Sequence, residues 1–372
     1  MAYSIHQRAN FPKNLTISTT SLEVLEGQQH STTLQEQPWI RNDYQEFGIA
    51  AKTWDASFAL LDYLLPQPHH HHHHHHPIQY EPASPLLNTA LESTNIHIID
   101  LGSGTCHLAT ELLQRLDSCA KFNISITVTD LPEVLPLLER NISSLKLKDP
   151  RHTISVRALT WGSTQETIAV LNSLPSRVNH APSSENTDLL LITCSDLVFF
   201  PFLFIPLLRT LLILTAPPPQ LLNATSNDGA PFAPPVVVLF GYKQRCAVKE
   251  FPFFELLGRY FKLEPILSRR KSTDPWELTR HTTKNTHNEE EEDHGGSNLI
   301  YLLRATRHSS TNNKQLDQLV LDSLLSKTPA DQETPINTTE QQDPLFTLGD
   351  ASAADQWEWI LLSNLSDHHL FS

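Results

Sequence analysis

The fold of this chain is decided by the stretch IIDLGSGT at residues 98–105. An apolar run ends at an acid and two glycines, and Leu108, Leu112 and Leu116 then recur at helical spacing. A strand that passes through a glycine-rich turn into a helix lets a ligand approach the backbone closely, near the helix N-terminus. The stretch therefore predicts a strand, a ligand-binding turn and a helix.

Outward from this stretch, strand-like and helical patterns alternate along the chain. Strand-like runs occur at 96–101, 124–128, 154–158, 189–193, 236–240, 263–266 and 299–303. Helical patterns occur at 54–65, 107–116, 132–138, 202–214 and 249–260. Such alternation indicates a parallel sheet with helices on both faces. The sequence therefore predicts an α/β, Rossmann-like fold with a seven-stranded, mostly parallel sheet.

Composition divides the chain into three parts. These are a polar N-terminal segment at 1–37, a main domain at 38–306 and an acidic tail at 307–372 that we expect to be mostly disordered. Within the tail, the apolar residues around Trp357 predict docking, either on the body of the protein or on a partner.

Four insertions interrupt the main domain. They are a run of eight histidines at 69–76 and predicted loops at 163–187, 216–235 and 268–297. We interpret the histidine run as a homopolymeric loop expansion, with capture of transition metals by a flexible tract as the alternative. We predict no other metal site.

Composition also limits the function classes. The net charge is −14, but the run at 289–293 and the tail hold most of the acidic excess, so the body is nearly neutral. A neutral body argues against a nucleic-acid interface. Polar and proline residues interrupt the apolar stretch 189–216, so we expect a buried strand and helix there and no membrane span. The four cysteines form no Cys-x-x-Cys pair, and no secretory signal is evident. We therefore predict a reducing compartment, the cytosol or nucleus, and expect a cytoplasmic protein.

Two observations at the glycine turn, His107 and Asp100, choose between nucleotide cofactors. In the dinucleotide-binding pattern Gly-x-Gly-x-x-Gly the third glycine would fall at His107. Asp100 precedes the first glycine, and a carboxylate there suits the ammonium group of S-adenosylmethionine better than a pyrophosphate. Asp130 ends the next strand-like run, where an acid can accept hydrogen bonds from ribose hydroxyls or cap the following helix. We predict S-adenosylmethionine and not NAD, the alternative being a glycine turn without a ligand.

A wider set of motifs resembles the family 16 methyltransferases. The segment TDLPEVLPLL at 129–138 is similar to the second motif of that family. The segments TWDA at 53–56, WG at 161–162, SDLVF at 195–199 and GYKQR at 241–245 are similar to other family motifs and lie in the family's order. The resemblance covers about residues 38–305 without the insertions. It implies a seven-β-strand, S-adenosylmethionine-dependent enzyme, in most members a protein-lysine methyltransferase and in some fungal members one that modifies a translation elongation factor.

The resemblance also implies site residues. Cofactor contacts are expected, beside Asp100, at Trp54, Gly102, Ser103, Gly104, Asp130, Trp161 and Ser195. We expect Asp196 to hold the ammonium of the substrate lysine and Phe199 to line the lysine channel, with helix capping as the alternative for Asp196. Phe199 stands where the family has tyrosine. Cys106 stands where the family commonly has a third glycine, a replacement that is tolerable if φ stays negative there.

We therefore predict a protein-lysine N-methyltransferase that acts on a protein substrate, with a translation elongation factor as a candidate. The alternatives are a small-molecule or nucleic-acid methyltransferase, and a catalytically weakened interaction protein that binds the cofactor.

Overall fold

The computed structural model describes residues 43, 46–66, 78–87, 95–117, 122–174, 189–216, 236–282, 299–308, 351–353, 355–358 and 360. The polar segment 1–37, the histidine run 69–76 and nearly all of the predicted loop 216–235 lie outside these residues. Among the helices of the described part, none has the length and apolar character needed to cross a membrane.

The core of the molecule is a mixed, mostly parallel sheet with the strand order β4-β3-β2-β5-β6-β11; at its edge, β7 and the short β10 (Arg280–Thr282) both pair with β11. Its strands are β2 (Asn95–Leu101), β3 (Asn123–Asp130), β4 (His152–Ala158), β5 (Leu189–Ser195), β6 (Val236–Lys243), β7 (Phe261–Pro265) and β11 (Leu299–Arg307). The five strands from β4 to β6 are parallel, and β11 runs antiparallel to both β6 and β7. All seven predicted strands are present, so the predicted fold class is confirmed.

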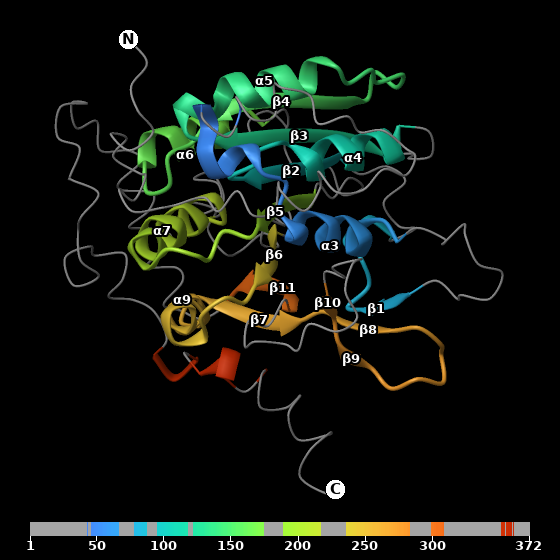
Figure 1. Cartoon of the computed structure of the whole chain (residues 1–372), viewed down its shortest axis with the longest axis vertical. Coiled ribbons are helices and arrows are strands. Elements are labelled where there is room, and N and C mark those ends of the chain that lie inside the picture. Colours follow the sequence, from blue (N-terminus) through green and yellow to red (C-terminus); the bar gives the residue numbers. More distant parts are fainter. Residues whose placement is uncertain are drawn as a thin grey trace, which may run out of the picture.

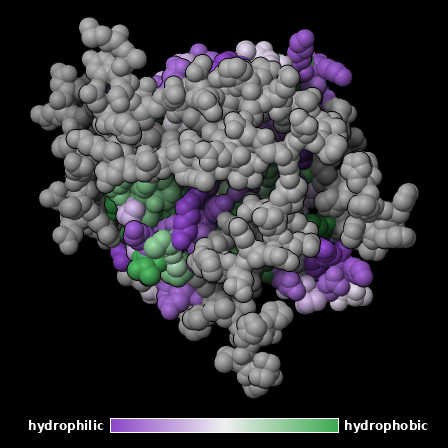
Figure 2. Space-filling model, in the orientation of Figure 1, coloured by the Kyte–Doolittle hydropathy of each residue, from purple (hydrophilic) through white to green (hydrophobic). Residues whose placement is uncertain are grey.

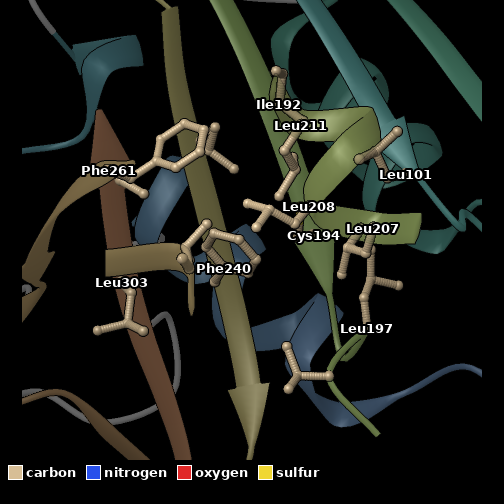
Figure 3. Packing of buried hydrophobic residues seen from close by; sticks show 14 of the residues in the cluster. Leu101, Ile192, Cys194, Leu197, Leu207, Leu208, Leu211, Phe240, Phe261 and Leu303 are labelled. Carbon is tan, nitrogen blue, oxygen red and sulfur yellow. The ribbon is translucent and has the colours of Figure 1, made fainter. Parts of the chain in front are cut away.

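Helices cover both faces of the sheet (Figure 1). The helices are α3 (Asp55–Leu64), α4 (His107–Leu116), α5 (Leu135–Ser143), α6 (Thr164–Asn172), α7 (Phe204–Leu214) and α9 (Ala247–Gly258). Buried residues of α3, α4 and α5 form one core layer, and those of α6, α7 and α9 form the other. Alternate strand residues face the two layers, so Ile192 and Cys194 of β5 meet Leu207, Leu208 and Leu211 of α7 (Figure 3).

Two predicted loops contain regular structure, which corrects those interpretations. The segment 163–187 begins with α6, whose start is capped by the Ser163 hydroxyl, which accepts a hydrogen bond from the Glu166 N–H at 3.3 Å. The segment 268–297 contributes to β8 (Leu267–Arg269) and supplies β9 (Glu277–Leu278) and β10 (Arg280–Thr282). Strand β10 pairs with β11, and β1 (Gln79–Glu81), β8 and β9 form a small second sheet.

Part of the predicted tail belongs to the core. Trp357 is 1% exposed and stacks on Phe254 of α9 with ring centroids 4.4 Å apart. The Gln356 side chain donates to the carbonyls of Gly258 and Phe261 and accepts from the Leu263 N–H. These contacts place residues 355–358 on the body of the protein, which decides between the two predicted docking sites. Strand β11 also extends one residue past the predicted domain boundary, to Arg307.

The visible face of the described part is mixed in character. Hydrophobic residues lie in patches between hydrophilic ones in the space-filling view (Figure 2).

Candidate active site

A pocket of about 340 Å³ opens at the carboxyl ends of β2, β3 and β5. This size lies in the range of about 300–1,000 Å³ that is usual for small-molecule sites. The pocket is at the switch point of the sheet, where β3 and β5 flank β2 on opposite sides and ligands of open α/β sheets bind. All ten predicted site residues line it, namely Trp54, Asp100, Gly102, Ser103, Gly104, Asp130, Trp161, Ser195, Asp196 and Phe199.

The glycine turn after β2 forms the floor of this pocket. Gly102 and Gly104 both have positive φ, +58° and +52°, which only glycine adopts without strain. A Cβ on Gly102 would lie 3.0 Å from Leu197 and 3.1 Å from Trp161, and one on Gly104 would lie 2.8 Å from the carbonyl oxygen of Ala50. The chain therefore comes too close to its neighbours for any side chain at these two positions.

Ser103 holds the turn against β3. Its N–H donates to the Thr129 carbonyl at 2.9 Å, and its hydroxyl donates to the Asp100 carbonyl at 2.9 Å. The same hydroxyl accepts from the Thr129 N–H at 3.1 Å. The Ser103 side chain is thus engaged in positioning the turn, although the residue lines the pocket as predicted.

Asp100 presents a buried carboxyl group to the pocket. The residue is 3% exposed, and one carboxylate oxygen accepts from the Thr193 hydroxyl at 2.5 Å. Burial raises the pKa of this carboxyl to about 6, against the opposing effect of its hydrogen bonds. Among the described residues, no cationic side chain forms an ion pair with it. Buried carboxylates normally have a charged or metal partner, so Asp100 is suited to a ligand cation.

Asp130 also lies at the pocket and is tied to two backbone N–H groups. Its carboxylate accepts from Gly104 at 2.9 Å and from Leu131 at 2.8 Å. Burial raises the pKa of Asp130 to about 6, the two hydrogen bonds lower it, and the nearby Asp100 and Glu133 carboxyls add to the increase. The N-cap residue of the following 3-10 helix, Pro132–Val134, is Leu131 and there is no side-chain cap, so the alternative of Asp130 as its N-cap is not what is observed.

The two predicted tryptophans lie in different surroundings. The Trp54 indole N–H donates to the Ile49 carbonyl at 3.2 Å, and the Lys52 and Arg245 cations lie 4.6 and 5.4 Å from its ring centroid. Trp161 packs against Gly102 and the core layer of α7. Close by, the Ser195 hydroxyl is buried and lacks a hydrogen-bond partner in the part of the chain that the structure describes. That hydroxyl is available to a ligand.

Asp196 is bound to an arginine that the sequence analysis did not single out. Its carboxylate accepts two hydrogen bonds from the Arg245 guanidinium, at 2.8 and 2.5 Å. Asp196 adopts a left-handed conformation with φ +61°, and its N–H donates to the Gly241 carbonyl at 2.8 Å. Asp196 does not cap the 3-10 helix Pro201–Leu203, because the N-cap residue of that helix is Phe200. Arg245 comes two residues after β6, the strand next to β5. That position in the sequence was the available signal that Arg245 lies near Asp196.

Phe199 belongs to an aromatic rim of the pocket. Its ring meets Phe200 edge to face with centroids 4.6 Å apart, and Phe200 stacks on Phe202 at 5.4 Å. Phe202 is 55% exposed. An apolar wall thus extends from Phe199 inside the pocket to the surface.

The backbone conformation of Cys106 does not meet the condition of a negative φ given in the sequence analysis. Its φ is +59° and not negative, so it takes the left-handed conformation in which the family commonly has a glycine. Its side chain is fully buried, and burial raises the pKa of the thiol. A non-glycine residue in this conformation costs on the order of 1–3 kcal/mol, which the surrounding core must compensate.

Comparisons with known proteins identify the family to which this chain is similar. A family model described as lysine methyltransferase matches residues 33–229, more than half of the chain. "Protein N-lysine methyltransferase METTL21A" of Xenopus tropicalis is 28% identical over 132 residues, which cover 34% of this chain and 46% of the relative. "Protein-lysine N-methyltransferase EFM6" of Saccharomyces cerevisiae is 28% identical over 226 residues, which cover 60% of this chain and 74% of the relative. The match thus spans less than half the length of the frog protein.

A solved structure was also similar. The crystal structure of DszA carbon methyltransferase matches 60% of this chain and 49% of its own, with 10% identity and a TM-score of 0.30.

Proposed function

The chain belongs to the lysine methyltransferase family of S-adenosylmethionine-dependent enzymes, and from this premise we propose that it methylates the side-chain amine of lysine in a protein substrate. The observation that carries the proposal is a pocket in which the glycine turn, the buried Asp100, the partly buried Asp130 and the Asp196 carboxylate meet. A pocket for the cofactor alone would not need the aromatic rim that leads outward from Phe199.

The pocket residues fit S-adenosylmethionine. When bound, this cofactor supplies an activated methyl group on a sulfonium. We assign its ammonium group to Asp100, whose buried carboxylate has no cationic partner in the described part of the chain. We assign its ribose hydroxyls to Asp130, since a carboxylate oxygen has lone pairs left after one backbone hydrogen bond. The unpartnered Ser195 hydroxyl and the faces of Trp54 and Trp161 supply the remaining polar and π contacts.

The part of the pocket formed by Asp196 and Phe199 is assigned to the lysine. A lysine side chain has a long apolar stem and a polar tip, so it suits a channel with aromatic walls and a polar end. Phe199 and Phe200 provide such walls, and Asp196 lies beside them. Phe199 has no hydroxyl, so its contribution here is the ring surface. The residues of this chain would thereby align the amine with the methyl group, and alignment is a large part of what a displacement reaction requires.

A translation elongation factor is our candidate substrate, on the basis of the family resemblance. The nearly neutral body supports a protein substrate over a nucleic acid.

The test is a labelling experiment with the purified chain. S-adenosylmethionine with a labelled methyl group is incubated with a cell lysate and, separately, with purified translation elongation factors. Label that survives nuclease treatment and appears as methyl-lysine after protein digestion supports the proposal. An Asp100→Asn variant is the control, since it should bind the cofactor ~10- to 150-fold more weakly and transfer less label when the cofactor is limiting. Label on nucleic acid or on small molecules, or none on protein, would contradict the proposal.

A further inference from the structure

The Asp196 carboxylate, which we assign to the substrate amine, already forms an ion pair with Arg245. Both carboxylate oxygens of Asp196 accept from the guanidinium. The Asp196 side chain is 1% exposed and that of Arg245 is 34% exposed, so the acid is enclosed while the arginine reaches the pocket mouth. A bidentate pair of this kind is among the stronger and more directional contacts that proteins form.

Arg245 is held in this place from the other side. Its N–H donates to the Glu250 carboxylate at 3.1 Å, and its guanidinium also donates to the Lys243 carbonyl at 3.2 Å. The Glu250 oxygen that receives this N–H also accepts from the Tyr242 hydroxyl at 2.6 Å. Both the backbone and the guanidinium of Arg245 are therefore fixed by neighbours, so the pair with Asp196 is a built feature of the pocket.

The ion pair affects the protonation state of the substrate lysine, because a free carboxylate favours the charged ammonium whereas methylation requires the neutral amine. A free lysine is an ammonium ion at neutral pH, with a pKa near 10.4, but only the neutral amine has the lone pair that attacks a methyl group. A carboxylate within about 4–6 Å favours the charged form of such a group by about 1–3 pKa units. An unpaired Asp196 would therefore bind the substrate tightly in the form that cannot react.

We propose that Arg245 neutralises Asp196 so that the pocket accepts the substrate lysine as the neutral amine. The inference rests on the proposed function and deepens it by assigning a positioning residue to the lysine site. Asp196 keeps lone pairs that can accept a hydrogen bond from the amine, and Arg245 removes its net charge. The lysine proton leaves to water before transfer. The amine lone pair then forms the N–C bond while the C–S bond breaks, and the sulfur departs as a neutral thioether.

Several other ionisable groups surround the pair of Asp196 and Arg245. Those lining the pocket are Lys52, Asp100, His107 and Asp130, and those behind or beside Arg245 are Tyr242, the Lys243–Asp55 pair and Glu250. Asp100 and Asp130 are assigned to the cofactor, and Lys52 lies over Trp54 with the same sign of charge as Arg245. Burial lowers the pKa of His107, so this side chain is neutral above pH 7. Removing Arg245 therefore changes the charge beside Asp196 more directly than any of these groups does.

The first test measures binding without turnover. The probe is n-butylammonium, an analogue of the lysine side chain, titrated by NMR into the full chain saturated with S-adenosylhomocysteine. We expect Arg245→Met to bind the probe at least ~10-fold more tightly than the unaltered protein, because the unpaired Asp196 carboxylate attracts the ammonium. A tenfold change corresponds to about 1.4 kcal/mol. The double variant Arg245→Met, Asp196→Asn should lose that gain. Equal affinity in the single variant and the unaltered protein would overturn the inference.

The second test measures the pH dependence of single-turnover methylation of the protein identified by the labelling experiment. Arg245→Met and Arg245→Gln should both shift the rising limb of the profile up by ~1–3 pH units, with a lower KM and a lower rate at pH 7. Arg245→Lys keeps the charge and should keep the original profile. A merely structural role would lower the rate without moving the profile, and that result would refute the inference.

Arg140→Met is the matched control. Arg140 forms an equally bidentate pair with the buried Asp43, at 2.8 and 2.6 Å, but does not line the pocket. We expect neither a changed probe affinity nor a shifted profile, and a shift as large as that of Arg245→Met would count against the inference. Absence of protein-lysine methylation by the unaltered chain would instead defeat the proposed function itself, and with it the premise of this inference.

Discussion

The Asp100→Asn substitution tests two effects of this carboxyl group. One is its effect on the free energy of unfolding, and the other is its effect on cofactor affinity. The Asp100 carboxyl is 3% exposed, and its pKa is raised to about 6 from an ordinary value of 3.8. Asparagine has nearly the same shape, and its amide oxygen can still accept from the Thr193 hydroxyl, which donates at 2.5 Å to Asp100. The variant therefore removes the charge and leaves the packing in place.

The magnitude follows from the pKa difference between the folded and unfolded states. Two pKa units at about 1.36 kcal/mol each give a destabilisation on the order of 3 kcal/mol by the ionised Asp100. Because the folded state holds the proton more tightly, it binds more protons than the unfolded state between about pH 4 and pH 6. Stability is therefore lost as the pH rises through this window, and the full penalty is present above about pH 6.

The assay is chemical denaturation of the cofactor-free protein and its variant at pH 7.5 and pH 4, with calorimetry of S-adenosylmethionine at pH 7.5. We expect Asp100→Asn to raise the free energy of unfolding at pH 7.5 by up to ~3 kcal/mol and to have little effect at pH 4. The same variant should bind the cofactor ~10- to 150-fold more weakly, because a charge-assisted hydrogen bond contributes ~1.5–3 kcal/mol.

The reasoning would be refuted by a variant that is less stable than the unaltered protein at pH 7.5, or by one that binds the cofactor with unchanged affinity. Asp149→Asn is a control for which the expected change in the free energy of unfolding has the opposite sign. Asp149 is on the surface, its hydrogen bonds to Arg151 lower its pKa to about 2, and it lies outside the pocket. Its substitution should remove a stabilising interaction and leave cofactor affinity unchanged.

Three further predictions concern other parts of the molecule. Asp130→Ala should weaken cofactor binding ~10- to 150-fold by calorimetry, whereas Asp196→Ala should stay within a few-fold of the original Kd; the reverse order would exchange the two roles. Gly104→Ala should lower the free energy of unfolding by ~1–3 kcal/mol, because its Cβ would lie 2.8 Å from the Ala50 oxygen at a positive φ, and an unchanged Tm would contradict this. Trp357→Ala should cost ~3–5 kcal/mol in chemical denaturation, and a loss under ~1 kcal/mol would show that this indole contributes little to the core.

The sequence was sufficient for the sheet and for the placement of the predicted site residues around one pocket. Parallel strands place their carboxyl ends at one edge, so Asp100, Asp130 and Ser195, each at or near a strand end, are brought together by strand order alone. The helix α6 was missed although Ser163 and Glu166 have the spacing of a capping box. Its sequence is polar at both ends, and the apolar pattern on which the prediction relied is short.

Contacts between distant segments were beyond the reach of sequence patterns. Asp196 and Arg245 are 49 positions apart and belong to different strand ends, so only the register of β5 beside β6 brings them together. The left-handed φ of Asp196 and Cys106 was equally hidden, because neither residue type requires it. In both cases the local preference is overridden by tertiary contacts: the Arg245 and Gly241 bonds at Asp196, and full burial at Cys106.

Tyr242 links the C-terminal segment to the proposed lysine site through Glu250, and this helps to explain why a segment so far along the chain belongs to the domain. The Trp357 ring meets the Tyr242 ring edge to face with centroids 5.8 Å apart. The Tyr242 hydroxyl donates to Glu250, and the same Glu250 oxygen receives the Arg245 N–H. Tyr242 lacks room to move, since Phe254 and Tyr301 also contact its ring. Because Glu250 is 2% exposed and relies on these two donors, a loosened Tyr242 would leave a buried carboxylate with fewer partners, and the position of Arg245 would be less well defined.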